Sequence, residues 1–499
     1  MSVYAFELPT TGSFSFADCF SDLTGTHTSA LAEATQARAS LRGLLKESKR
    51  TDGDKDYLRL VKTLEEYIPY LYGVVACVQA GELSERGRPV FSWRTTLSST
   101  FMHSSPRLSL PGLASEQAFT LLTYAFALSN LARLNVGALG AYERARGLSD
   151  AERKAKDEKL QFAVTLLCKA AGVFAHVSEV VLVQAEKDPG WLNGVERPPE
   201  LSKEVASALS KLSLAAAQSL AARKLLTKAA ADLAVAPGPP LPKSHPKPAL
   251  LAMLHLDAAA LCSGALALLR IPGASRARLK PPMKASTSSF KAKFGRSKSS
   301  GVEKGDDGED DAPSASGSGR EPDVASVASD LLRFAGDSAA HHTALSHKWL
   351  GVDAGEAGGD RAGAAVGFLL WSRKELEEIK DSAGAAGKDE GKDGRKSRKE
   401  KVLEELEAVG GFLRHYKKMN DSLSFKPVPS QSDLQAFIPA GRMAVAVRPY
   451  TPPTPEFGPG SVEYTRRQAE ALELEGGGES ADASPPLDKG TYLGAGSYF

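Results

Sequence analysis

Apolar residues recur at spacings of three and four along most of the chain, which is the pattern of amphipathic helices. In the segment 157–187 these positions are Leu160, Val164, Leu167, Ala171, Phe174, Val177 and Val181, and the Asp-Pro-Gly at 188–190 ends the pattern. The same periodicity predicts helices over residues 28–50, 116–146, 201–235 and 249–270. Strand signals are weak, and the best short candidates are 14–20 and 90–97. The pattern therefore predicts a mostly α fold built from stacked helical hairpins.

Three stretches interrupt this pattern. Residues 273–323 are rich in Ser, Gly, Lys and Asp, residues 381–400 are a Gly, Lys, Asp and Arg tract, and Pro, Gly and Glu dominate beyond Pro449. Such segments have too few apolar groups to offset the entropy lost on ordering. We expect the first two to be disordered insertions and the last to be an extended tail.

Composition and charge exclude several classes of protein. The chain has 499 residues, a net charge of +2 and 42% hydrophobic residues, so it is neither histone-like nor strongly acidic. Cys19, Cys77, Cys168 and Cys262 lie far apart, which argues against a disulfide scaffold and a clustered zinc site. The first residues do not resemble a signal peptide, and we find no run of about 18 uncharged apolar residues. We therefore expect a cytoplasmic protein whose membrane contact is peripheral.

Enzyme motifs are absent from the sequence. We find no phosphate-binding glycine loop, H-E-x-x-H or G-x-S-x-G motif. His341, His342 and His347 lack a carboxylate at ligand spacing, so we interpret them as surface residues. The Gly-rich and acidic stretch 351–360 lacks calcium-loop spacing and is interpreted as a loop between helices. We expect no catalytic residue, no cofactor and no bound metal.

A basic run lies in the first predicted insertion. It contains Arg276, Arg278, Lys280, Lys284, Lys291, Lys293, Arg296 and Lys298, with Phe290 and Phe294 between them. Lys291, Lys293, Arg296 and Lys298 are candidate contacts to anionic lipid, at about 1 kcal/mol for each basic residue near the membrane. The alternative is a solvated linker neutralised by the acidic stretch that follows. We do not expect nucleic-acid binding, because the chain as a whole is not basic.

Several motifs in sequence order resemble the BRO1 domain family, over roughly residues 1–455. The resemblance is carried by Phe91-Ser92-Trp93-Arg94, Ala114–Phe119, Cys168–Phe174, Ala215–Gln218 and Asn420–Phe425 with the following Val428-Pro429, Asp433-Leu434 and Ile438. It implies a banana-shaped, mostly helical domain with a tetratricopeptide-like core and small β-hairpins. From the composition we expect residues 456–499 to be a disordered tail. The resemblance also implies binding to the C-terminal helix of the ESCRT-III filament subunit at the endosome or plasma-membrane cortex.

Within this family the likeness is strongest to the fungal group of pH-response regulators. It rests on Phe6–Thr11, Glu66–Leu71 and Trp93–Ser99. This likeness implies a non-enzymatic scaffold of alkaline-pH signalling, which works with other components of that pathway to promote proteolytic activation of a zinc-finger transcription factor. A general endosomal sorting adaptor is the alternative. An enzyme of unrecognised helical fold would require polar residues gathered in one pocket.

The resemblance also indicates a partner surface. The likeness around Ala217-Gln218 carries an apolar contact to Ala221 and a basic contact to Lys224, and the likeness of Ala249–Leu254 carries apolar contacts to Leu250 and Leu254. Residues four apart share one helical face, which suits recognition of a partner helix. The alternative is that both leucines belong to the core.

Overall fold

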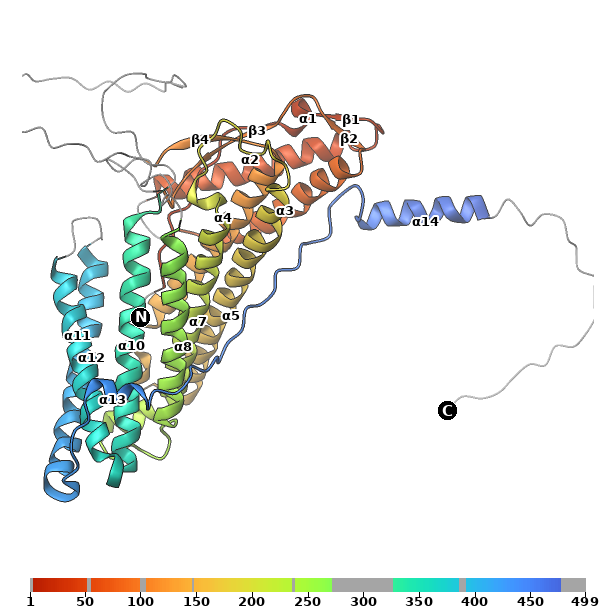
Figure 1. The fold of residues 1–499 in the computed structure, drawn as a ribbon. Helices are drawn as coiled ribbons and strands as arrows, with labels where there is room; N and C mark the ends of the chain where they lie inside the picture. The colour runs from red at the N-terminus through yellow and green to blue at the C-terminus, as the bar shows by residue number, and fades with distance from the viewer. Residues whose placement is uncertain are drawn as a thin grey trace, which may run out of the picture. The chain divides into compact units, whose positions relative to one another are not determined.

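The computed structural model describes residues 3–51, 55–98, 105–145, 148–235, 238–271, 326–385 and 392–476. The chain divides into two compact units (Figure 1). Unit 1 comprises residues 1–11 and 91–450, and unit 2 comprises residues 12–90 and 451–499. The basic run at 276–298, with Lys291, Lys293, Arg296 and Lys298, lies outside the described residues, as does the whole of the predicted insertion 273–323.

Unit 1 is a series of long helices in which each packs mainly on its neighbours in sequence. Figure 1 shows these helices side by side. They are α4 (Leu113–Leu139), α5 (Asp150–His176), α7 (Lys203–Val235), α8 (Pro248–Leu269), α10 (Ser329–Ala357), α11 (Ala362–Ala385) and α12 (Lys392–Met419). Helix α5 continues through the π-helical turn Val177–Val181 into α6 (Leu182–Ala185), and the short helix α13 (Gln431–Gln435) follows α12. The expected mostly helical fold is confirmed.

Local sequence explains where these helices begin and end. Ser149 and Glu152 form a reciprocal capping box at the start of α5. Pro248 occupies the first turn of α8, where its missing N–H costs nothing. Gly140, with φ of 55°, ends α4. The predicted helix stop at 188–190 is also confirmed, because the structure has turns there.

A two-stranded sheet and the N-terminal segment pack against α4. Strand β3 (Val90–Arg94) pairs with β4 (Arg107–Pro111), which confirms the strand expected at 90–97. Buried Trp93 stacks on Phe119 and donates from Nε1 to Glu116 at 2.7 Å. These contacts explain the aromatic motif around Trp93 as a core anchor.

Two helices are long and apolar enough to cross a membrane by length and composition, within the described residues, although the sequence led us to expect none. They are the continuous helix Asp150–Ala185 and α8. Their most apolar windows are 67% and 44% buried inside the protein, and each helix packs between two neighbours in unit 1. Core helices of a soluble helical stack meet the same test, so this property is weak support for a membrane span.

Unit 2 is a helical pair with a small sheet. It contains α1 (Phe16–Cys19), α2 (Thr28–Arg50), α3 (Tyr57–Gln79), the antiparallel strands β1 (Phe20–Asp22) and β2 (Leu83–Glu85), and α14 (Val462–Gly476). The segment 451–461 returns to this unit, where the Phe457 ring fills the space beside Gly73 on α3. A Cβ atom at Gly73 would lie 2.8 Å from that ring, so the close approach requires glycine.

Several local expectations were wrong. Residues 14–20 form a helical turn and the start of β1 rather than one strand. The stretch 351–357 belongs to α10 rather than to a loop. Helix α12 begins at Lys392 within the predicted insertion 381–400, and α14 lies within the predicted tail 456–499, whereas residues 386–391 and 477–499 lie outside the described residues. Residues 451–455 are extended, as expected beyond Pro449. Close packing explains the error at 351–357, because Gly351 and Gly355 are not loop residues but points where Leu369 and Tyr416 pack closely on α10.

Candidate partner-binding surface

A buried glutamine holds the C-terminal part of unit 1 across the seam between α7 and α8. We call residues 439–450 the strap. The Nε2 of Gln218 on α7 donates to the carbonyl oxygen of Arg442 at 2.7 Å and to Asp257 on α8 at 3.1 Å. Its Oε1 accepts from the N–H of Ala444 at 2.9 Å. One side chain therefore joins α7, α8 and the strap.

The strap continues over α5. The N–H of Arg448 donates to the carbonyl oxygen of Cys168 at 3.1 Å, and the rings of Tyr450 and His176 are 5.0 Å apart. Between these contacts lies Gly172, where a Cβ atom would be only 1.8 Å from the carbonyl oxygen of Arg448. Positions 168, 172 and 176 are four apart, so one face of α5 carries the strap.

Ala221 and Lys224 lie on the face of α7 that Gln218 begins, at successive spacings of three. Both side chains are partly exposed, and the ammonium of Lys224 donates to the amide oxygen of Gln161 on α5 at 2.7 Å. Leu250, in the first turn of α8, is also partly exposed. Ala221, Lys224 and Leu250 are therefore accessible, and we call them the α7–α8 surface.

Leu254 does not belong to this surface. Its side chain is only 2% exposed, and its carbonyl oxygen lies 3.4 Å from Nε2 of Gln218. The expectation that it offers an apolar contact to a partner is wrong, because its side chain is buried. The spacing of four from Leu250 placed both residues on one helical face, but burial changes along that face once the strap crosses it.

Two exposed apolar residues border the α7–α8 surface and were not predicted from the sequence. Leu225 follows Ala221 by four positions on α7 and is 39% exposed. Met443 is 59% exposed and lies in the strap between the two residues that bind Gln218. A spacing rule applied to α7 could have found Leu225, whereas Met443 is brought there only by the path of the strap.

Two of the three histidines of α10 lie in the core, whereas His341 is partly exposed. His342 and His347 are buried, and Nδ1 of His342 lies 3.0 Å from Nδ1 of His255 on α8. His347 pairs with Glu375 on α11 at 2.8 Å. The surface interpretation was wrong for His342 and His347, because α10 packs on α8 and on α11 and more than one of its faces is covered. Burial lowers the pKa of His255 to about 3, which keeps the ring neutral.

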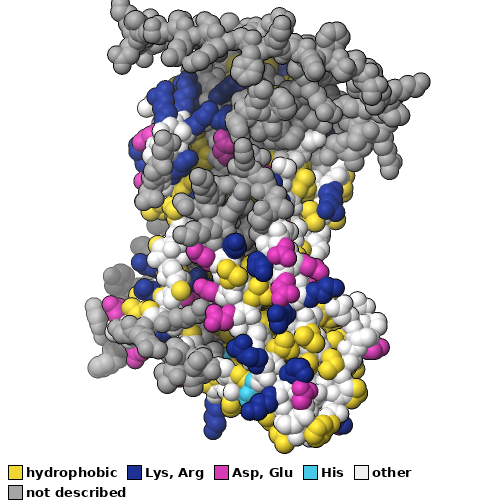
Figure 2. Space-filling model, turned by 90° about the vertical axis from the view of Figure 1, so that its left-hand side faces the viewer, with side chains coloured by type: hydrophobic (Ala, Val, Ile, Leu, Met, Phe, Trp, Pro, Cys, Tyr) yellow, Lys and Arg dark blue, Asp and Glu magenta, His cyan; other side chains and the backbone are white. Residues whose placement is uncertain are grey.

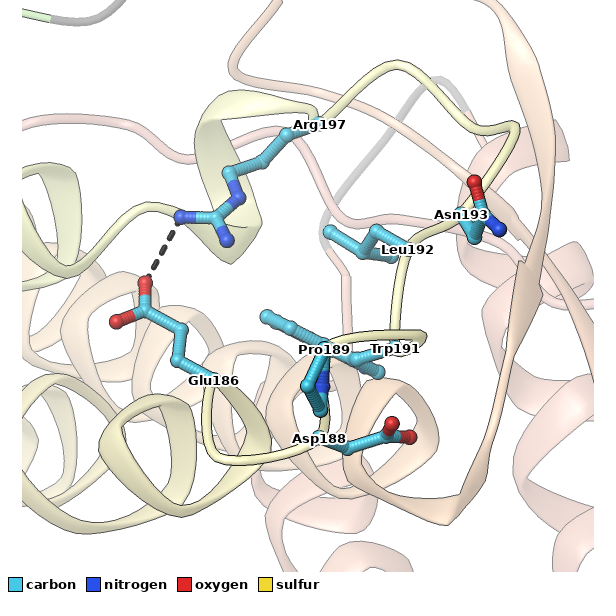
Figure 3. Close-up of a pocket in the computed structure, with 7 residues that line it drawn as sticks. All are labelled: Glu186, Asp188, Pro189, Trp191, Leu192, Asn193 and Arg197. Atoms are coloured by element: carbon cyan, nitrogen blue, oxygen red, sulfur yellow. Dashed lines mark hydrogen bonds and ion pairs between the residues drawn. The ribbon is translucent and has the colours of Figure 1, made fainter.

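A cavity of about 290 Å³ lies beside the loop that follows α6 (Figure 3). It is lined by Glu186, Asp188, Pro189, Trp191, Leu192, Asn193 and Arg197. Glu186 pairs with Arg197 at 2.8 Å and with Lys203 at 2.7 Å. Burial alone would raise the pKa of Glu186, but these two hydrogen-bonded cations outweigh it and hold the pKa below its ordinary value. Glu186 is thus held by two cations, as in a loop anchor, and no nucleophile and base converge among the lining residues.

Another face of unit 1 exposes hydrophobic side chains near the end of α12. Figure 2 shows hydrophobic side chains gathered at the lower end of the face that it views. Exposed large apolar residues cluster in the sequence between Met419 and Phe437, and they are Met419, Leu423, Phe425, Val428 and Phe437. Asn420 fixes the turn between them, because its side chain binds both the N–H and the carbonyl oxygen of Lys426.

Comparison with known proteins finds similarity along the whole chain. Residues 15–461 match the family profile described as "BRO1-like domain". The "pH-response regulator protein palC" of Cryptococcus neoformans var. neoformans is 33% identical over 522 residues, covering 100% of both chains. The protein of the same description from Yarrowia lipolytica is 26% identical over 508 residues, covering 99% of both chains.

Two solved structures share the fold. The "ALIX BRO1 CHMP4C complex" matches with a TM-score of 0.52 and 16% identity, covering 91% of this chain and 98% of that chain. The crystal structure of ALIX in complex with the SIVmac239 PYKEVTEDL late domain matches with a TM-score of 0.56 and 16% identity. This chain is covered over 96% of its length and spans 56% of that ALIX chain. At such identity the likeness shows the fold alone.

Proposed function

The chain belongs to the family of proteins with a BRO1-like domain, and from this membership we propose that it is a non-enzymatic adaptor of alkaline-pH signalling. The observation that carries the proposal is the similarity to the palC protein of Cryptococcus neoformans over the full length of both chains. In this function the protein recruits the ESCRT-III filament subunit to the endosome. The assembled complex then promotes proteolytic activation of a zinc-finger transcription factor.

The α7–α8 surface supports the recruiting step. Ala221, Leu225 and Leu250 offer exposed or partly exposed apolar groups, and the ammonium of Lys224 faces an amide oxygen rather than a carboxylate. An amphipathic partner helix with an acidic residue beside its apolar stripe fits such a surface. The solved ALIX BRO1 structure that shares this fold was determined as a complex with CHMP4C.

Binding of an isolated ESCRT-III C-terminal helix tests the recruiting step. Fluorescence anisotropy with a labelled peptide should show that Leu250→Asp and Lys224→Glu each weaken binding at least about tenfold, the loss expected when an anchor worth roughly 2 kcal/mol is removed. Leu58→Asp is the matched control, because Leu58 is an exposed leucine of unit 2. Equal affinities for all four proteins would place the partner elsewhere.

A deletion strain tests the pathway. At alkaline pH, loss of the gene should abolish processing of the transcription factor, and the Leu250→Asp allele should reproduce that loss. Normal processing together with a cargo-sorting defect would favour the alternative, a general endosomal sorting adaptor. The two outcomes separate the functions, because loss of processing indicates a role in signalling and loss of cargo sorting indicates a general sorting adaptor.

A further inference from the structure

Three side chains of unit 2 that are distant in sequence converge on one point. They are His27 at the start of α2, Cys77 in the last turn of α3, and Glu82 in the turn before β2. One ligand atom from each, an imidazole nitrogen, the thiol sulfur and a carboxylate oxygen, lies within 4.8 Å of the other two. Cys77 is completely buried and His27 nearly so.

The backbone positions these groups through short hydrogen bonds. The N–H of Glu82 donates to the carbonyl oxygen of Cys77 at 2.9 Å, which fixes the turn that links them. The N–H of Leu23 donates to the carbonyl oxygen of Glu82 at 3.0 Å, and the N–H of His27 donates to the Asp22 carboxylate at 2.6 Å. The three side chains are therefore held by turns that are themselves tied together.

The C-terminal part of the chain covers this cluster. Gly458, with φ of 73°, passes so close to Cys77 that a Cβ atom there would be 2.0 Å from the sulfur. The Phe457 ring lies 5.6 Å from the ring of His27. The hydroxyl of Tyr464 on α14 donates to Oε1 of Glu82 at 2.9 Å, leaving Oε2 for the cluster.

We propose that His27, Cys77 and Glu82 bind a zinc ion. Imidazole nitrogen, thiolate sulfur and carboxylate oxygen are the ligand types of protein zinc sites, and sites with three protein ligands complete a tetrahedron with water. The charges of one thiolate and one carboxylate balance the two positive charges of the ion. Tyr464 then serves as the outer hydrogen-bond partner that orients Glu82.

Zinc would replace a direct contact in this cluster. The Nε2 of His27 lies 2.8 Å from Oε2 of Glu82, which is a hydrogen bond. Ligand atoms around a tetrahedral zinc are roughly 3.3–3.7 Å apart for bonds of about 2.0–2.3 Å. The pair must therefore separate by somewhat less than 1 Å, and the Cys77 proton is released because the thiolate is the ligand.

The alternative is a hydrogen-bonded cluster with no ion. The sequence analysis led us to expect no metal, because the four cysteines lie far apart. Cys77 and Glu82 are five residues apart, and His27 lies 50 residues before Cys77. Neither spacing belongs to a known zinc motif, and only the fold brings the three groups together.

Metal titration of the full chain tests the proposal. After dialysis against a chelator, isothermal titration calorimetry with zinc chloride should show binding of a single ion per chain. Cobalt(II), used as a spectroscopic substitute, should give the near-ultraviolet thiolate-to-metal band. Cys77→Ser and His27→Gln should each weaken zinc binding at least about 10- to 100-fold. Zinc should raise the unfolding temperature of the wild type more than that of either variant.

Matched variants keep the test decisive. Cys262→Ser removes another fully buried thiol, in α8 of unit 1, and should leave zinc binding unchanged. If Cys77→Ser fails to fold, Glu82→Gln replaces it, because the amide keeps the size of the side chain and an oxygen for Tyr464. Absence of zinc binding to the wild type, or binding that survives both Cys77→Ser and Glu82→Gln, would overturn the proposal.

Discussion

The amide nitrogen of Gln218 lies 2.7 Å from the carbonyl oxygen of Arg442, and this hydrogen bond joins residues 224 positions apart. The same side chain also binds Ala444 and Asp257 and is almost completely buried. No other residue among the described contacts of the strap binds it through both a donor and an acceptor atom. Gln218 is thus the main polar attachment of the strap to α7.

Replacing this glutamine should loosen the strap. Gln218→Ala removes several buried hydrogen bonds and leaves the Ala444 N–H and Arg442 carbonyl without this partner, so we expect a loss of about 1–3 kcal/mol in the free energy of unfolding. Chemical denaturation measures the loss, and hydrogen exchange at Ala444 should accelerate. Gln161→Ala is the control, since Gln161 is exposed and should change stability by less than about 0.5 kcal/mol. Equal effects of the two substitutions would contradict this role.

Two Gly→Ala substitutions, at Gly172 and at Gly137, test how closely the strap approaches α5. Gly172→Ala would place a methyl group 1.8 Å from the Arg448 carbonyl oxygen, so the strap must move, at a cost of about 1–3 kcal/mol in stability. Gly137→Ala on α4 meets no atom within 4 Å and should instead stabilise the helix by about 0.5–1 kcal/mol. Thermal unfolding distinguishes the two signs, and a neutral Gly172→Ala would mean that the strap is not packed there.

The buried histidines predict a loss of stability in acid. Burial, with a smaller contribution from His341, lowers the pKa of His255 to about 3 in the folded protein, against about 6.5 in the unfolded chain. Between these values only the unfolded chain takes up the proton, so the free energy of unfolding falls as pH decreases from about 6.5. The slope approaches about 1.4 kcal/mol per pH unit for each such group.

Urea unfolding between about pH 7.5 and pH 5 measures this effect. The double variant His255→Gln with His342→Gln should have a flatter profile than the wild type, because Gln does not titrate. Lys348 and Glu405, which pair at 2.7 Å nearby, are unchanged in the comparison. Parallel profiles for the two proteins would show that other groups cause the acid sensitivity.

Substitutions of Leu250 and Leu254 in α8 should separate effects on stability from effects on binding. Leu254→Asp places a carboxylate at a side chain that is 2% exposed, and should lower the free energy of unfolding by more than about 3 kcal/mol. Leu250→Asp, at the partly exposed position, should leave the melting curve nearly unchanged while weakening binding of the partner helix. Circular dichroism melting of both variants measures the difference in stability, and the peptide anisotropy assay measures the loss of binding. Similar melting losses would assign Leu250 to the core as well.

The course of the main helices could be predicted from the sequence because their apolar spacing is regular and their ends carry Pro and Gly. The Asp-Pro-Gly at 188–190 and Pro248 marked ends that the structure confirms. Glycine misled the prediction within α10, because Gly351 and Gly355 serve close packing rather than a turn. Composition alone cannot separate these two uses of glycine.

The candidate sites could be predicted only in part, because they depend on contacts between residues that are distant in the sequence. The resemblance predicted contacts at Ala221, Lys224, Leu250 and Leu254, but it could not show that Leu254 is buried, since burial depends on the packing of the folded chain. Met443 and the cluster of His27, Cys77 and Glu82 are assembled by segments that meet only in the folded chain. The burial of His342 likewise follows from the two neighbours of α10.

The return of residues 451–461 to unit 2 has a consequence for synthesis on the ribosome. Helices α2 and α3 emerge among the first 80 residues, yet Phe457, which packs beside Gly73, is made more than 350 residues later. At about 5–20 residues per second, roughly 20 s or more separates the two events. During that interval the nascent α2–α3 pair exposes the apolar surface that Phe457 later covers. Chaperone capture should therefore concentrate on this early segment, and should end when the ribosome has released the chain beyond residue 461.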